Sequence, residues 1–482
     1  MSSVHLSRRS ALKALGAGAA ALAIGGGPAV GAARAAGGTT AGDLRAALGS
    51  KVLFPGDPDY DAERAAFNTL ITQSPNAIVL AQTAQDVATA VRIGAGGLGW
   101  PIAVQATGHG ICVPADGALL INMRELNGVT VNSAARTARI SGGAKWKDVL
   151  AVSAPLGLLP PVGSTSDVGA TGYIGGGGVP VIGRTYGFAS DRVRSIELVA
   201  PDGRQLCLSP YQHADLFWAV RGGGSNFGAV TSFEIDLLPA TTVYAGGLVF
   251  PAATAAQAYQ QYVAWTATAS DRITSVASFV HRPTVEALSI EVVYLGSAAD
   301  GAAEIAPLRA LGPATDSVAE VPIALMDSIF NVPATPSASV ASGALIGALD
   351  PSGIDLVFGT LGFQDSTVPS GVLEVRQLGG AFGRQPAAPS AVGNRDADFL
   401  LFLNNPVPTP AQAAAIEQWQ QDALARLAPV LTGKTVPTFL GTLDTTAQEV
   451  STAYTATDWS RLRQLKQAYD PANLFRINHN IR

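Results

Sequence analysis

Residues 102–110 read Ile102-Ala103-Val104-Gln105-Ala106-Thr107-Gly108-His109-Gly110. The first four residues are an apolar run that predicts a short strand, and the rest form a glycine-flanked loop around a histidine. Glycine has no side chain and tolerates positive φ, so such a loop brings main-chain N–H groups close to a ligand. The loop is therefore suited to cradle a phosphate, and His109 is placed to contact whatever that phosphate carries.

The N-terminus has the order of a secretory signal. Basic residues in Ser7-Arg8-Arg9-Ser10-Ala11-Leu12-Lys13 precede a weakly hydrophobic Ala/Gly run and the small-x-small pattern Ala33-Arg34-Ala35. The paired arginines indicate the twin-arginine type, a route that carries folded proteins and suits an enzyme loaded with cofactor before export. We expect residues 1–35 to be removed and the protein to be secreted; the alternative is a disordered or membrane-anchoring tail.

Charge and cysteine content exclude several classes of protein. Cleavage after Ala35 removes four cations and no acid, so the net charge of −5 becomes −9. An acidic chain is a poor candidate for nucleic acid or anionic membranes, and no later stretch is long and apolar enough to anchor it in a bilayer. Two cysteines, Cys112 and Cys207, cannot form a disulfide framework, and with five scattered histidines they cannot form a structural zinc site.

The pattern of strands and helices predicts an α+β fold and not a regular βαβ alternation. Short apolar or alternating runs predict strands at 77–81, 102–105, 118–122, 129–132, 138–141, 193–199, 205–208 and 229–237. Helices are expected over 83–91, 146–151 and 459–469, and residues 40–75 are expected to be a helical lead-in. Near Leu238-Pro239 the sequence pattern changes, and beyond this point we expect longer Ala-rich helices that alternate with strands such as 289–294.

Two further glycine-rich loops follow the one at His109. They span residues 163–178 and 222–228. Each loop alone is weak evidence for a cofactor site, because glycine clusters are usually turns. None has the strand–GxGxxG–helix context of a nicotinamide site, and the chain has no P-loop motif.

Taken together and in order, the motifs resemble one family: FAD-linked oxidases with the vanillyl-alcohol oxidase or PCMH-type fold, in the berberine-bridge-enzyme-like branch. The matching segments are residues 107–110, 120–127, 168–178, 186–191, 215–231 and 470–481. The resemblance implies an FAD-binding PCMH-type domain of two α+β subdomains over 40–238. It also implies an α+β substrate domain over 239–435, whose antiparallel sheet covers the flavin, and a berberine-bridge-like segment over 436–482 that returns to the FAD domain.

The resemblance also implies the cofactor site. The family's covalent histidine falls on His109, which would bond the 8α carbon of FAD; a neutral imidazole is a competent nucleophile near neutral pH. The other residues expected to contact FAD are Ala106, Thr107, Gly108, Gly110, Thr165, Val168, Gly169, Gly172, Tyr173, Gly176, Gly177, Gly228, Val230, Asn478 and Asn480. His479, between the two asparagines, is expected to position them.

The chain departs from the family at two positions. Thr165 stands where many relatives carry a second, cysteinyl link to FAD, so a single covalent bond through His109 follows; Cys112 is interpreted as a small buried residue, not a substitute. Val436 stands where many relatives carry a catalytic tyrosine, and it cannot transfer a proton. Candidate catalytic residues are then Tyr173 and Tyr186, although each is more readily structural, and Gln377, which is expected to face the substrate pocket.

These observations predict a secreted FAD-dependent oxidoreductase that takes a hydride from a small alcohol or amine and is reoxidised by dioxygen. The absent cysteine favours a small substrate over an oligosaccharide. Four alternatives remain open: a sugar or oligosaccharide oxidase, a flavin dehydrogenase with another acceptor, a non-catalytic FAD-binding or storage protein, which Val436 suggests, and an exported carbohydrate-binding module.

Overall fold

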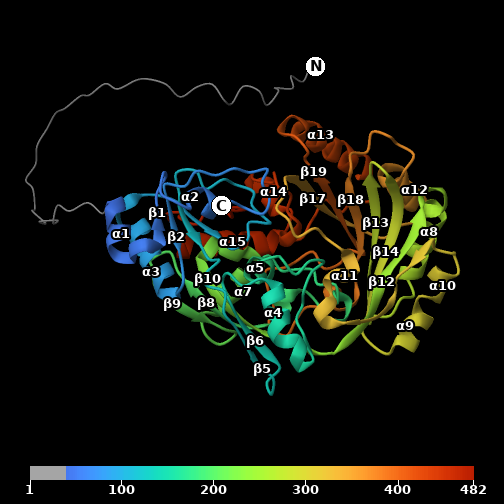
Figure 1. Ribbon diagram of the computed structural model, residues 1–482, viewed down its shortest axis with the longest axis horizontal. Coiled ribbons are helices and arrows are strands. Elements are labelled where there is room, and N and C mark those ends of the chain that lie inside the picture. The colour runs from blue at the N-terminus through green and yellow to red at the C-terminus, as the bar shows by residue number, and fades with distance from the viewer. Residues whose placement is uncertain (1–39) are drawn as a thin grey trace, which may run out of the picture. The chain divides into compact units, whose positions relative to one another are not determined.

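The computed structural model describes residues 40–482, so the expected signal at 1–35 lies outside the described residues. Residues 40–239, the N-terminal half, contain two main sheets (Figure 1). The smaller has the order β1 (Val52–Leu53), β2 (Ala77–Leu80), β4 (Leu119–Asn122) and β3 (Ile102–Gln105). Its strands β2, β4 and β3 run parallel, and β1 is antiparallel to β2.

Helix α3 (Ala84–Ile93) connects β2 to the rest of this sheet. Thr83 caps it by accepting from the Asp86 N–H, while the Asp86 carboxylate accepts from the Thr83 N–H, so both ends of a capping box are satisfied. Its apolar face packs with α1 (Ala41–Leu48) on the sheet. The predicted lead-in is thus only partly helical: α1 and the single turn α2 (Tyr60–Glu63) are joined by irregular chain.

The second sheet is antiparallel throughout. Its order is β5 (Val129–Asn132), β6 (Thr137–Ser141), β10 (Ala229–Asp236), β8 (Val193–Val199) and β9 (Gln205–Leu208). A turn at Pro201-Asp202-Gly203 joins β8 to β9, and Gly203 occupies positive φ there. Helices of this half are α4 (Trp146–Ser153), α5 (Ala170–Gly175), α6 (Gly183–Tyr186) and α7 (Ala214–Gly223), and a two-stranded ladder joins β7 (Leu158–Leu159) to β11 (Leu238–Pro239).

A large antiparallel sheet occupies residues 242–406. Its order is β15 (Thr315–Asp316), β12 (Thr242–Pro251), β14 (Val285–Tyr294), β13 (Ile273–Arg282), β18 (Gly371–Gln377), β19 (Phe399–Pro406) and β17 (Ser339–Ile346), and β16 (Ala319–Pro322) also pairs with β12. Helices of this region are α8 (Ala252–Thr266), α9 (Ala298–Glu304), α10 (Ala306–Arg309), α11 (Asp327–Phe330), α12 (Pro351–Leu361) and α13 (Pro410–Leu427). Figure 1 shows α8, α9, α10 and α12 on the outer side of the sheet, away from the N-terminal half.

Successive side chains along a strand point to opposite sides, so the large sheet has two different faces. On β18, Leu373 and Val375 join the core formed with the helices, and on β13 Phe279 does the same. On the opposite face, Val293 belongs to the core of the N-terminal half. This second face, which we call the inner face, is therefore the one turned toward the predicted cofactor loops.

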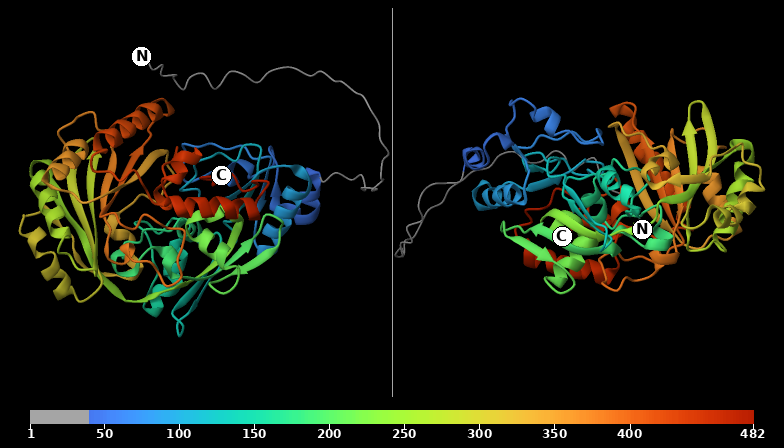
Figure 2. Two further views of the ribbon diagram at one scale, coloured as in Figure 1. Left: turned by 180° about the vertical axis from the view of Figure 1, so that it is seen from behind. Right: turned by 60° about the horizontal axis from the view of Figure 1, so that its bottom comes forward.

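The C-terminal segment returns to the N-terminal half. It contains α14 (Ala447–Ser451) and α15 (Ala456–Tyr469), and α15 lies beside α7, as the view from behind shows (Figure 2). A buried arginine, Arg184 of α6, also links the two regions by donating to the carbonyls of Ile273 and Ala269. Residues 40–482 thus form one compact unit of α+β type, which confirms the predicted fold class. Within these residues, no helix combines the length and apolar character needed to cross a bilayer.

Candidate active site

The loop after β3 holds His109 in a defined position. Its Nδ1 lies 2.8 Å from the Thr107 hydroxyl, and its ring stacks on Phe67 at 3.6 Å between centroids. Gly108 has φ +75°, and a Cβ there would lie 2.6 Å from that of Ala66, so this turn requires glycine. Burial, followed by the positive charge of Lys145, lowers the pKa of His109 to about 4. The imidazole is therefore neutral at pH 7.

The three glycine loops and the C-terminal tail converge. The first and second loops meet where the Gly169 N–H donates to the Thr107 hydroxyl at 3.3 Å, and where a Cβ on Gly169 would lie 3.2 Å from that of Ala106. The second and third meet where a Cβ on Gly175 would lie 3.3 Å from Gly224. The tail joins the third loop through Asn478, whose amide donates to Ser225 at 3.4 Å. Segments separated by more than 300 residues thus form one site.

Tyr173 lies where the second loop meets the segment that follows Val436. Thr438 accepts from the Gly178 N–H at 3.3 Å and donates to the Tyr173 carbonyl at 3.4 Å. A Cβ at Gly176 would lie 2.6 Å from Thr438 Oγ1 and one at Gly177 would lie 2.8 Å from a Val392 methyl, so both glycines permit close packing.

Several predicted cofactor residues have buried polar atoms without a partner. These atoms are His109 Nε2, the Tyr173 hydroxyl, and the Oδ1 atoms of Asn478 and Asn480. Buried polar groups are normally hydrogen-bonded, so unpaired ones at a shared site indicate groups that a ligand satisfies. Gly110 and Gly172 have open space where a side chain would lie. The residues present therefore fit a bound FAD, which has polar groups along its whole length.

The remaining predicted contacts have mainly structural surroundings. Gly228 has φ +144°, and a Cβ would lie 2.3 Å from the Val199 carbonyl, so glycine lets β10 approach β8. Val230 is buried in that pairing. The Val168 carbonyl accepts from the Trp146 N–H at 3.1 Å, and Thr165 Oγ1 lies 3.4 Å from the Asp167 N–H.

Two of the three candidate catalytic residues lie elsewhere. Gln377 is on the helix-covered face of β18, where its amide donates to the Thr266 carbonyl at 3.0 Å and accepts from Ser275 at 2.8 Å. The prediction that it faces the substrate pocket is wrong, because the strand's alternation places Glu374 and Arg376 on the inner face instead. The Tyr186 hydroxyl donates to the Asp236 carbonyl at 2.6 Å, and Arg192 lies over its ring, which makes it a structural residue.

Sequence reasoning missed the polar groups of the inner face. Arg376 donates from Nε to Glu374 at 2.7 Å and from Nη2 to Ser164, in the second loop, at 2.8 Å. On β14, Glu291 accepts from Ser278 at 2.7 Å. A usable signal was present, since charged residues interrupt otherwise apolar strands at 285–294 and 371–377 and charges are seldom buried without a role.

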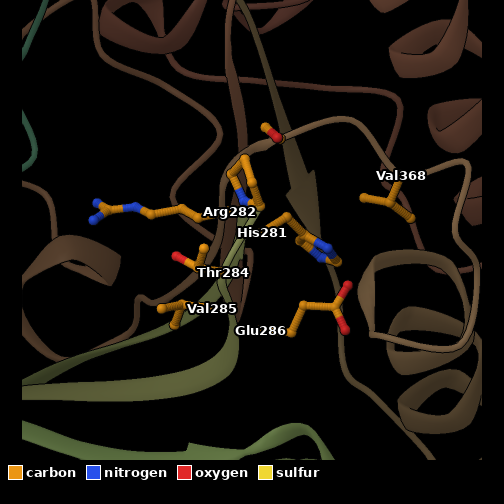
Figure 3. Close-up of a pocket in the computed structure, with 8 residues that line it drawn as sticks. His281, Arg282, Thr284, Val285, Glu286 and Val368 are labelled. Atoms are coloured by element: carbon orange, nitrogen blue, oxygen red, sulfur yellow. The ribbon is translucent and has the colours of Figure 1, made fainter.

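A cavity of about 420 Å³ lies outside this site, at the turn between β13 and β14 (Figure 3). Arg282, Thr284 and Glu286 line it, as does His281, whose Nε2 lies 2.8 Å from the Leu361 carbonyl. The turn is at the opposite end of β13 from Ile273, which contacts Arg184 of the N-terminal half. The cavity is therefore separate from the convergence of loops around His109.

Comparison with known proteins identifies the family. Residues 75–209 match the family model described as FAD binding domain, and residues 438–482 match the one described as berberine and berberine like. The chain belongs to the berberine-bridge-enzyme-like FAD-linked oxidoreductases. FAD as cofactor, the PCMH-type fold and an enzymatic class are thereby confirmed, in place of a carbohydrate-binding module.

Individual relatives cover nearly the whole of this oxidoreductase. The (R)-6-hydroxynicotine oxidase of Paenarthrobacter nicotinovorans is 28% identical over 463 residues, 89% of this chain and 96% of that protein. The crystal structure of 6-hydroxy-D-nicotine oxidase from Arthrobacter nicotinovorans superposes with a TM-score of 0.79 at 25% identity, covering 90% of this chain and 98% of the other. A chitooligosaccharide oxidase shares the fold with a TM-score of 0.80 at 20% identity, covering 92% and 99%.

Proposed function

We propose that this oxidoreductase acts on a small amine or alcohol, holds FAD through one covalent bond to His109, and uses dioxygen as the final acceptor. Bound FAD supplies the hydride acceptor. The observation that carries the proposal is the half-buried, uncharged His109 imidazole, whose buried Nε2 has no partner among the described residues. The near full-length similarity to a 6-hydroxynicotine oxidase supports a small nitrogen-containing substrate.

The structure suggests a division of roles among residues of the site. Thr107 orients the His109 ring through Nδ1, which leaves Nε2 as the nitrogen available for the covalent bond. The low pKa keeps the ring neutral, and Nε2 carries the nucleophilic lone pair in the tautomer whose Nδ1 donates its proton to the Thr107 hydroxyl oxygen. Asn478 and Asn480 offer their unpaired carbonyl oxygens to N–H groups of the cofactor.

Anaerobic titration tests the proposed activity. The purified holoenzyme is mixed without oxygen with a panel of small amines, alcohols and oligosaccharides, and the loss of flavin absorbance is recorded before air is admitted. Bleaching by a small amine or alcohol and rapid return of colour in air are expected. Bleaching by oligosaccharides alone would favour an oligosaccharide oxidase, the activity that two structural neighbours have by their names. Slow return of colour would favour a dehydrogenase.

Secretion by the twin-arginine route is proposed from residues 1–35 alone. Replacement of Arg8 and Arg9 by lysine should retain the protein in the cytoplasm with its signal uncleaved, because the route reads the arginine pair. Immunoblots of culture supernatant and cell fractions measure this. Normal export of the double variant would refute the proposal.

A further inference from the structure

A row of polar residues lies on the inner face of the large sheet, among its apolar contacts with the N-terminal half. In register, Val276 of β13 lies between Glu291 of β14 and Arg376 of β18, and Ser278 lies between Ser289 and Glu374. Directly opposed residues of antiparallel strands have Cβ atoms about 5 Å apart. The two acids and the arginine therefore form one cluster across three central strands.

The position of this cluster is set by contacts on both sides. Arg376 binds Ser164 of the second glycine loop and lies over the Phe439 ring at 5.5 Å, in the segment that follows Val436. Two residues beyond Glu291 on the same face, Val293 packs into the core of the N-terminal half. Glu291 therefore lies on the part of the sheet that is turned toward the cofactor loops.

The charges of the cluster do not balance. Glu374 is neutralised by Arg376, whose Nη2 lies 2.6 Å from it. Glu291 is 8% exposed and accepts from the Ser278 hydroxyl, but within residues 40–482 it has no ion pair. A buried carboxylate without a cation is costly, and natural proteins keep one where a ligand or a reaction uses it.

We infer that Glu291 binds a cationic nitrogen of the substrate, and that the substrate class is therefore amines and not alcohols or sugars. This inference rests on the proposed function and narrows it. An ammonium or alkylated ring nitrogen would supply the missing positive charge, and charge-assisted contacts of this kind are about twice as strong as neutral ones. A neutral sugar or alcohol would leave the carboxylate uncompensated.

Burial supports the assignment, because it raises the pKa of Glu291 to about 7, with a smaller contribution from repulsion by Glu374. Other titratable or charged groups near this position are Arg376, Tyr262 of α8 and Tyr173 of α5; burial raises the pKa of both tyrosines, so they stay uncharged near neutrality. Binding of a permanent cation should therefore strengthen about tenfold from pH 6 to pH 8, as Glu291 loses its proton.

The test measures binding to the oxidised holoenzyme by flavin difference spectra. The probes are N-methylpyridinium and benzyltrimethylammonium, with benzyl alcohol as the neutral probe. We expect Glu291→Gln to weaken the binding of both cations by about tenfold or more and to abolish the pH dependence of that binding. The affinity for benzyl alcohol should be unchanged. Glu291→Asp should restore part of the affinity. Glu286→Gln is the matched control, because Glu286 is an exposed acid on the same strand.

The outcomes are distinguishable. Equal cation affinity in wild type and Glu291→Gln, or no preference of the wild type for the cations over benzyl alcohol, would overturn the inference. If the flavin spectrum and its anaerobic bleaching are intact in that case, the proposed function survives and only the role of Glu291 is wrong. If no substrate of the panel bleaches the flavin, the proposed function itself fails.

Discussion

Replacing Lys466 by methionine should strongly destabilise the protein. The ammonium group of Lys466 is almost fully buried and donates to the Asn226 carbonyl at 2.7 Å, the Asp470 carboxylate at 2.7 Å and the Phe475 carbonyl at 3.0 Å. Burial lowers its pKa, and Asp470 opposes that shift. Methionine has similar length but no donor, so the substitution leaves the Asp470 carboxylate without its cation at 0% side-chain exposure.

The magnitude follows from the loss of a buried partner. Removing one member of a buried ion pair costs about 3–5 kcal/mol, because the remaining charge is uncompensated. Unfolding about 440 residues has an entropy near 0.9 kcal/mol per kelvin. Dividing the free-energy loss by this entropy gives a fall of about 4 °C in the midpoint of thermal unfolding. Adding Asp470→Asn to Lys466→Met should recover about 1–3 kcal/mol of the lost free energy of unfolding. The buried charge is then gone, while one side-chain oxygen still accepts from the main chain.

Thermal and urea unfolding, followed by circular dichroism, measure both effects. Lys434→Met is the matched control: Lys434 is exposed, and its loss should shift the midpoint by less than about 1 °C. A midpoint for Lys466→Met within about 1 °C of wild type would refute the reasoning. So would a double variant whose losses simply add, because coupling through the buried pair requires partial recovery.

Two further predictions concern the cofactor loops. His109→Ala should release the flavin into the supernatant on acid precipitation, whereas Cys112→Ser should retain it in the pellet, because burial raises the pKa of the Cys112 thiol to about 12 and keeps it unreactive; flavin that stays in the His109→Ala pellet would disprove the tether. Gly178→Ala should cost about 2–4 kcal/mol in urea unfolding, because φ is +68° and a Cβ would lie 2.4 Å from the Tyr173 ring. Gly359→Ala, at an exposed position of α12 with open space around it, should cost less than about 1 kcal/mol, and equal costs for the two would contradict the packing argument.

Local patterns predicted the elements of the N-terminal half well, because their signals are short-range. Apolar runs between turn residues predicted the strands, and the helix expected over 83–91 is found as α3, which begins at Ala84 with Thr83 as its cap. The last helix begins at Ala456, three residues earlier than predicted, because Thr455 caps it by accepting from Asp458. That cap was readable in the sequence as well.

The candidate site was predicted in part. The loop around His109 and the unpaired atoms of Asn478 and Asn480 lie together as the motif order implied. Gln377 was assigned to the wrong face, because the period-two alternation of a strand tells which residues share a face but not which face is inner. Glu291 was missed for a related reason: its surroundings come from strands that are distant in sequence, and register across a sheet is set by tertiary contacts.

The tail also sets an order in time. Asn226 donates to the His479 carbonyl at 3.1 Å and accepts from the Ile481 N–H at 2.9 Å, so residues 479–481 close the third glycine loop. When the third loop has emerged from the ribosome, residues 479–481 have not yet been synthesised. A complete cofactor site therefore forms only after these residues have been added, and a chain that stops before them would leave the loop open. Every earlier intermediate of synthesis thus lacks a closed cofactor site.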